Sequence, residues 1–209
     1  MNSSPKSLLI GTGNPGKIVE VKSMLEGLPF ELTSLAEFRS LSTVTETGQT
    51  FAENAALKAQ GYALQTNLWT ISDDSGLEVD ALDGAPGVLS ARLAGEETSD
   101  AQRVSLLLSK LSLIPEKRRT ARFVCATAVS DADGKLIFSA TGICDGRLSL
   151  HPRGSGGFGY DPVFVPEGYN LTLAELDPEV KNQISHRGRA FAATRDFLIA
   201  LHEGILTSS

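Results

Sequence analysis

Apolar residues recur along this chain with two different spacings, and together they predict an α/β protein. After a short apolar strand at 8–10, residues Ile18, Val21, Met24 and Leu25 recur every three or four positions and predict a helix with one apolar face. Further helices are expected at 51–64, 100–111 and 187–203, with a short one from 178, and strands at 30–35, 68–72, 77–79, 120–129, 135–141 and 143–148. Because helix-linked strands are followed by hairpins, we expect a mixed β-sheet flanked by helices, in one domain spanning 1–209.

Capping residues and turns mark where these elements begin and end. Asn14 is suited to cap the first helix, and Pro15 fits its first position. Thr50 and Glu53 match a capping box for the second helix. Residues 131–134 predict a hairpin turn, and 113–119 are the best candidate for a linker.

Composition narrows the possible functions. The 209-residue chain has a formal net charge of −6, which argues against a general nucleic-acid binder. No apolar run is long enough to span a bilayer, and residues 1–7 lack the apolar segment of a signal peptide, so we expect a cytoplasmic protein with no membrane partner. Cys125 and Cys144 lie in apolar strands and are expected to be buried free thiols.

The glycine-rich turn between residues 10 and 18 predicts a phosphate site, because backbone N–H groups and a helix N-terminus both favour an anion. Three patterns fit it. Gly11, Gly13 and Gly16 match the dinucleotide fingerprint, while Gly11, Gly16 and Lys17 match a P-loop except that Ile18 replaces the hydroxyl residue. The third pattern is T-G-N-x-G-K, which adds an amide and an ammonium group. Glycines required only by the backbone geometry of the turn would also explain it.

Carboxylates form the second candidate feature. Asp73 and Asp74 follow an apolar strand, and we expect the strand to end there in a turn, with Asp74 the better candidate for a cation ligand. Glu46, in a polar loop, could supply a second ligand. Asn54 and Lys58 are four residues apart on one helix and share a face, which indicates a polar site or a solvated surface.

Aromatic and basic residues form the third feature. Phe158 is flanked by glycines, so its ring could stack on a nucleobase, although aromatic residues more often fill cores. His186 and Arg187 begin the last helix, where cations are unfavourable unless an anion binds, and Lys181 precedes them.

The order of these motifs resembles the inosine triphosphate pyrophosphatase family, which hydrolyses noncanonical purine nucleoside triphosphates. The matching stretches are T-G-N-P-G-K at 12–17, E-T-G-Q-T-F at 46–51, E-N-A at 53–55, K-A at 58–59, D-D-S-G-L at 73–77, G-A-P-G at 84–87, S-A-R at 90–92, G-F-G-Y-D-P at 157–162 and S-H-R-G at 185–188. The resemblance covers nearly the whole chain.

This resemblance implies a fold of two lobes with a central substrate cleft, usually in a homodimer, and hydrolysis of dITP, ITP and XTP to the monophosphate and pyrophosphate with Mg²⁺. Asp74 would be the proton acceptor and, with Glu46, a magnesium ligand. The implied substrate contacts are Thr12, Gly13, Asn14, Pro15, Gly16, Lys17, Lys58, Ser75, Phe158, Gly159, Tyr160, Asp161, Lys181, His186 and Arg187. An NAD-dependent oxidoreductase and a nucleotide sensor without catalysis are the alternatives.

Overall fold

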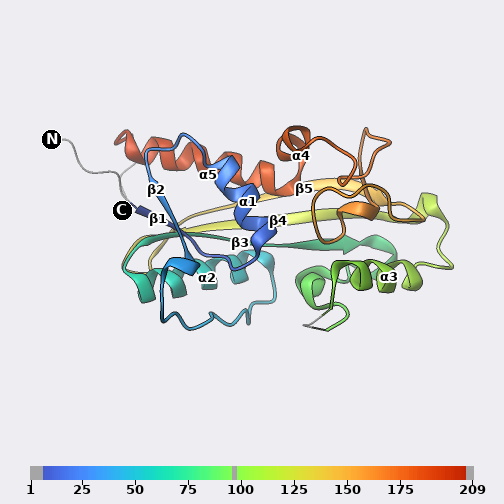
Figure 1. The fold of residues 1–209 in the computed structure, drawn as a ribbon, viewed down its shortest axis with the longest axis horizontal. Coiled ribbons are helices and arrows are strands. Elements are labelled where there is room, and N and C mark those ends of the chain that lie inside the picture. The colour runs from blue at the N-terminus through green and yellow to red at the C-terminus, as the bar shows by residue number, and fades with distance from the viewer. Residues whose placement is uncertain (1–6, 96–97, 206–209) are drawn as a thin grey trace. The chain divides into compact units, whose positions relative to one another are not determined.

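The computed structural model describes residues 7–95 and 98–205, which form a mixed six-stranded sheet flanked by helices, as the sequence predicts (Figure 1). Strand β1 pairs in parallel with β2 and β3, whereas β5 and β6 are antiparallel, and the strand order is β2-β1-β3-β4-β5-β6. The elements are β1 (Ser7–Ile10), α1 (Pro15–Met24), β2 (Glu31–Ser34), α2 (Phe51–Thr66), β3 (Trp69–Val79), α3 (Asp100–Lys110), β4 (Thr120–Ser130), β5 (Leu136–Leu148), β6 (Phe164–Pro166), α4 (Pro178–Ile184) and α5 (His186–His202).

The chain divides into two compact units, each assembled from segments that are distant in sequence. Unit 1 comprises Met1–Asp74, Cys125–Gly142 and Gly188–Ser209, and unit 2 comprises Ser75–Val124 and Ile143–Arg187. The predicted linker at 113–119 lies inside unit 2. There the buried Arg119 donates hydrogen bonds to the carbonyls of Leu111 and Ile114, and these bonds hold the segment against the end of α3.

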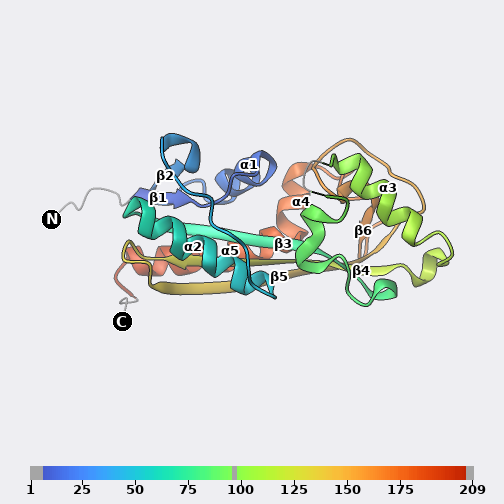
Figure 2. The same cartoon turned by 90° about the horizontal axis from the view of Figure 1, so that it is seen from below.

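Unit 1 has helices on both sides of its strands. Leu8 and Ile10 of β1 join a core with residues of α1 and α5, among them Val21 and Phe191. Helix α2 lies on the other side of the strands (Figures 1 and 2). Its buried positions recur at helical spacing and include Ala55, Ala59, Tyr62 and Ala63.

Unit 2 is organised around α3. Val104, Leu107 and Leu111 pack into one core with residues of β3, β4 and β5. The same core includes Tyr160 and Phe164, which come from the glycine-rich segment and the short strand that follows it. Helix α3 therefore packs in one core with the segment that carries Phe158.

The prediction that the strand ends after residue 72 is wrong, because β3 continues through Asp73 and Asp74 to Val79. Asp73 and Asp74 are buried within the strand, and each has polar partners that compensate its charge, so no turn is needed to expose them. The predicted strands at 135–141 and 143–148 are likewise one continuous strand, β5.

Two composition-based predictions can be compared with the described residues. Cys125 and Cys144 are buried free thiols, as expected. In the part of the chain that the structure describes, no helix combines the length and apolar character needed to cross a bilayer. Residues 1–6, on which the signal-peptide prediction partly rests, lie outside the described residues.

Candidate active site

The glycine-rich turn leads from β1 into α1 as predicted. A side chain at Gly11 would overlap the hydroxyl of Ser72, which donates a hydrogen bond to the Gly11 carbonyl at 3.1 Å, so the close approach of two strands requires glycine here. The side chain of Asn14 accepts a hydrogen bond from the Lys17 N–H at 3.1 Å, which confirms it as the cap of α1. The turn therefore presents the positive end of a helix beside Lys17.

Lys17 reaches the strand that carries the paired carboxylates. Its Nζ lies 2.9 Å from Oδ2 of Asp73, whose side chain is 1% exposed. The thiol of Cys125 also lies 3.8 Å from this carboxylate oxygen. Asp73 thus positions the ammonium group of Lys17 at the glycine-rich turn.

Asp74 points the other way, because side chains alternate along a strand. Its Oδ2 accepts a hydrogen bond from Nδ2 of Asn54 at 3.1 Å, and its Oδ1 lies 3.7 Å from Nζ of Lys58. Asn54 and Lys58 are both buried on α2 and contact Asp74, so their shared face is not a solvated surface.

The loop that carries Glu46 is fastened to α2. The N–H of Gly48 donates to Oδ1 of Asn54 at 2.8 Å, and the N–H of Gln49 donates to Glu53 at 2.6 Å. Nζ of Lys58 then lies 2.5 Å from Oε1 of Glu46. One ammonium group therefore contacts two carboxylates, Glu46 and Asp74, that come from distant segments.

The electrostatics of this cluster reflect one lysine shared between several acids. Burial raises the pKa of Asp74 above its ordinary value and Glu46 adds to the rise, while Lys58, Lys17 and Asn54 oppose it. Burial alone would lower the pKa of Lys58, but Asp74, Asp73 and Glu46 outweigh it, and the pKa is raised. Asp74 is thus a carboxylate that accepts a proton more readily than usual, beside a lysine that stays charged.

The oxygen donors of this cluster fit a hard divalent cation. Glu46 and Asp74 already hold one cationic group, and carboxylates are ligands that Mg²⁺ favours. Among residues 7–95 and 98–205, no group of three or more His, Cys, Asp or Glu side chains is placed to hold a metal. Magnesium bound here would therefore need further oxygens from water or a phosphate, which is its usual coordination beside nucleotides.

In unit 2, the residues around Phe158 form a tight turn. Oδ2 of Asp161 accepts hydrogen bonds from the Phe158 N–H at 2.9 Å and from Nζ of Lys181 at 2.7 Å. Gly157 has a φ of +69°, and a side chain on it would overlap the Asp161 carboxylate. Glycine at 157 therefore permits both the turn and the buried Asp161–Lys181 ion pair.

The Phe158 ring lies beneath two buried cations. Nζ of Lys181 is 5.2 Å from the ring centroid, and the guanidinium carbon of Arg187 is 5.4 Å from it. Arg187 also donates a hydrogen bond to the Ser75 hydroxyl at 2.8 Å. The half-buried ring is therefore an aromatic surface with hydrogen-bond donors beside it.

Two predicted substrate contacts are packed against the core of unit 2. The His186 ring stacks on Phe123 with centroids 4.6 Å apart. Tyr160 is 4% exposed, and its hydroxyl donates to the Ser90 carbonyl at 2.9 Å. Burial raises the pKa of Tyr160 to about 12, with Arg103 opposing the rise and Asp100 adding to it. The roles of His186 and Tyr160 toward substrate stay predictions.

The predicted residues thus fall into two sets that the structure assembles within separate units. Unit 1 contains Thr12, Gly13, Asn14, Pro15, Gly16, Lys17, Glu46, Lys58 and Asp74, and unit 2 contains Ser75, Phe158, Gly159, Tyr160, Asp161, Lys181, His186 and Arg187.

Sequence reasoning gave no role to two residues that position others. Asp73 holds Lys17, and a buried carboxylate in an apolar strand was the available signal. Asp100 is the other, and it accepts a hydrogen bond from the Gly159 N–H. Nothing in the local sequence around Asp100 indicates this contact, which spans 59 positions.

Comparisons with known proteins identify the family of this chain. A family model described as the Ham1 family matches residues 8–197. A dITP/XTP pyrophosphatase from Geobacter sulfurreducens is 48% identical over 191 residues, which cover 91% of this chain and 96% of that protein. A solved HAM1 protein from Coxiella burnetii has a TM-score of 0.84 at 38% identity, covering 93% of this chain and 98% of that chain. A dITP/XTP pyrophosphatase structure from Mycobacterium abscessus has a TM-score of 0.73 at 45% identity, covering 90% and 98% of the two chains. The chain belongs to the Ham1 family.

Proposed function

We propose that this protein hydrolyses purine nucleoside triphosphates with altered bases, namely dITP, ITP and XTP, to the monophosphate and pyrophosphate, with Mg²⁺ as cofactor. The names of its relatives support the substrate class, since proteins 45% and 48% identical to this chain are called dITP/XTP pyrophosphatases. The structural observation that carries the proposal is the contact of Lys58 with both Glu46 and Asp74.

We assign Asp74 as the acceptor of the proton from the attacking water. A water molecule attacks the α-phosphorus, the bond from that phosphorus to the bridging oxygen breaks, and pyrophosphate leaves. Asp74 orients this water and accepts its proton, a role that suits a buried carboxylate beside Lys58. The hydrogen bond from Asn54 fixes the orientation of the Asp74 carboxylate.

Charge on the triphosphate is offset by the lysines of unit 1. Lys17 lies at the N-terminus of α1, where backbone N–H groups also favour phosphate, and Lys58 lies beside Asp74. Glu46 and Asp74 are the residues that would hold Mg²⁺. When bound, this ion supplies Lewis-acid stabilisation of the charge on phosphate oxygens.

The base is assigned to the Phe158 surface of unit 2. Its ring offers an aromatic face for stacking, worth about 1–3 kcal/mol per base. Arg187 and Lys181, both near the ring, are hydrogen-bond donors. Hypoxanthine and xanthine carry a 6-oxo group that accepts such bonds, whereas adenine carries an amine, so donors aimed at this position would reject ATP.

The deciding experiment is pyrophosphate release from dITP, ITP, XTP, GTP and ATP, with Mg²⁺ and with a chelator. We expect release from the first three, little from ATP, and loss of all activity with the chelator.

Asp74→Asn should lower kcat by about a thousandfold while nucleotide binding persists. Asp133→Asn, which changes an exposed acid in the β4–β5 turn, is the matched control and should keep full activity. Near-normal turnover in Asp74→Asn would remove this residue from the mechanism, and equal rates on ATP and dITP would refute the base assignment. Binding of dITP without turnover would instead support a sensor.

The remaining properties belong to the same proposal. We infer a cytoplasmic homodimer, with no nucleic-acid or membrane partner, because free nucleotides are the proposed substrate. Sedimentation of the purified protein tests the dimer.

A further inference from the structure

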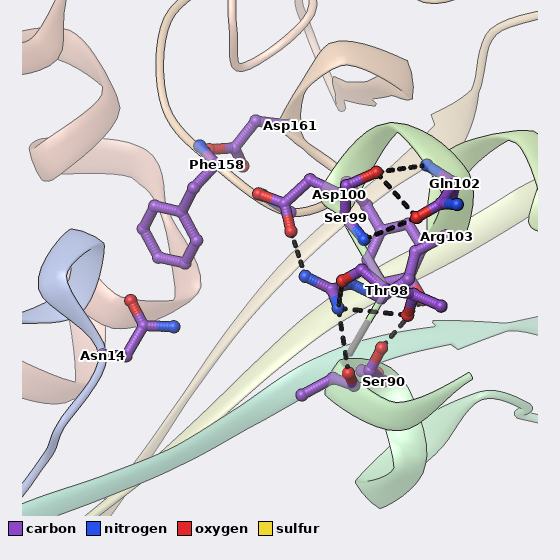
Figure 3. A network of polar contacts seen from close by, with 12 residues as sticks. Asn14, Ser90, Thr98, Ser99, Asp100, Gln102, Arg103, Phe158 and Asp161 are labelled. Atoms are coloured by element: carbon purple, nitrogen blue, oxygen red, sulfur yellow. Dashed lines mark hydrogen bonds and ion pairs between the residues drawn. The ribbon is translucent and has the colours of Figure 1, made fainter. Parts of the chain in front are cut away.

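The turn that carries Phe158 is held from outside by a residue of α3. Oδ2 of Asp100 accepts a hydrogen bond from the Gly159 N–H at 2.7 Å. The other carboxylate oxygen contacts the guanidinium of Arg103 (Figure 3). Asp100 is the first residue of α3, and Gly159 immediately follows Phe158. The contact therefore joins two segments that the chain itself does not bring together.

Arg103 fixes the direction of the Asp100 side chain. Its Nη1 donates to the carbonyl of Thr98 at 2.6 Å and to the carbonyl of Ala91 at 3.2 Å, while Nη2 contacts Asp100. The side chain of Arg103 is 17% exposed and that of Asp100 is 43% exposed, so solvent screens this ion pair in part. With Arg103 held in this way, one oxygen of Asp100 is occupied and the other is directed at the turn.

The turn needs such a support because glycine weakens it. Gly157 and Gly159 both have positive φ, at +69° and +63°, and glycine leaves the backbone many alternative conformations. Within the turn, Phe158 N–H donates to Asp161 and Asp161 N–H donates to the Phe158 carbonyl. The Gly159 N–H points out of this turn toward Asp100, so Asp100 selects one orientation of the peptide that follows the ring.

We propose that Asp100 is a positioning residue for base recognition, which holds the Phe158 ring in its binding orientation through the Gly159 N–H. This inference rests on the assignment of the base to Phe158. The proposal predicts that Asp100 contributes to nucleotide binding and not to the chemical step. None of the contacts described for Asp100 involves Asp74 or the lysines assigned to the triphosphate, Lys17 and Lys58.

A purely structural role of Asp100 in α3 is the competing explanation. An acid in the first turn also stabilises a helix. Gln102 provides a matched control, because it completes the capping box with Ser99 in the same turn but does not contact the Phe158 segment. Asp100→Asn gives an intermediate case, since its amide oxygen can still accept the Gly159 hydrogen bond while its amide nitrogen cannot accept one from Arg103.

The test measures KM and kcat for dITP with the full-length protein. Asp100→Ala should raise KM about fivefold, the effect of losing a partly exposed charged hydrogen bond, with kcat within about twofold. Gln102→Ala should leave KM within about twofold of the unsubstituted protein, and Asp100→Asn should raise KM by less than Asp100→Ala does. In a Phe158→Ala background, Asp100→Ala should have no further effect on KM, because both substitutions act on the same ring.

Three results would overturn the proposal: an unchanged KM in Asp100→Ala, an equal rise in Gln102→Ala, or additive effects of Asp100→Ala and Phe158→Ala. Amide hydrogen exchange followed by NMR supplies a readout that does not need substrate. Asp100→Ala should speed exchange at Gly159 while leaving the Val163 amide, which donates to the Tyr160 carbonyl, unaffected. If the unsubstituted protein releases no pyrophosphate from dITP, the proposed function fails, and exchange at Gly159 alone then decides whether Asp100 holds the turn.

Discussion

The ion pair between Lys17 and Asp73 allows a structural role of Lys17 to be separated from a role toward substrate. The two charged atoms are 2.9 Å apart, and the side chains are only 12% and 1% exposed. At an effective dielectric constant of about 20, two unit charges at this distance attract by about 6 kcal/mol. Desolvation of both groups offsets part of this attraction, and removing one partner of a buried pair costs about 3–5 kcal/mol.

Lys17→Met should therefore lower the free energy of unfolding by about 3 kcal/mol, because it leaves the Asp73 carboxylate buried without its ammonium partner. Asp73→Asn in the same background should recover about 2 kcal/mol of this loss, since the amide carries no charge. Urea unfolding of the four proteins, without metal or nucleotide, measures the coupling. The exposed pair Arg122–Asp80, with side chains 42% and 49% exposed, is the control and should couple by less than about 1 kcal/mol.

Pyrophosphate release then decides what Lys17 does toward substrate. If its ammonium group stabilises the departing pyrophosphate, the double variant should regain stability but remain at least about a hundredfold slower than the unsubstituted protein. A double variant that recovers both stability and turnover would show that Lys17 has only a structural role. A coupling energy below about 0.5 kcal/mol would refute the reasoning from burial and distance.

Three further predictions concern single side chains. Phe158→Ala should raise KM for dITP about tenfold through lost stacking, with a much smaller change in kcat, as measured by steady-state kinetics. Asn54→Leu removes a hydrogen bond that favours ionised Asp74, so the pKa of Asp74 should rise further, as followed by carbon NMR of the metal-free protein; an unchanged or lower pKa would contradict this. The pKa of Tyr160 is raised from 10.0 to about 12, so its contribution to stability is complete below pH 10 and is lost as pH rises toward 12. Urea unfolding across this pH range should show a steeper loss for the unsubstituted protein than for Tyr160→Phe.

Local patterns predicted the helices well because each carries its own capping signal. Asn14 caps α1, and the capping boxes of Thr50 with Glu53 and Ser99 with Gln102 begin α2 and α3. Strand ends were less accurate. Two adjacent aspartates are typical of a turn, and only their partners on other elements, Lys17 and Asn54, explain why β3 continues through them.

Some contacts of the candidate site could be predicted from local sequence, and others depend on how the chain folds. The shared face of Asn54 and Lys58 could be predicted because helical spacing determines it. The shared contact of Lys58 with Glu46 and Asp74 needed the fold, since the three residues come from a loop, a helix and a strand. The packing of Tyr160 into the core of unit 2 also depends on the fold, and its role toward substrate stays a prediction.

The uninterrupted course of β3 makes the protein sensitive to the length of this strand. Asp73 faces Lys17 and Asp74 faces Asn54 because neighbouring residues in a strand project to opposite sides. A single residue inserted or lost between Trp69 and Asp73 would move one acid into the place of the other and shift the second acid away from both partners. We expect insertions and deletions to be tolerated far more readily in the surface loops than between Trp69 and Asp73, because the number of residues there determines which side of the strand each acid faces.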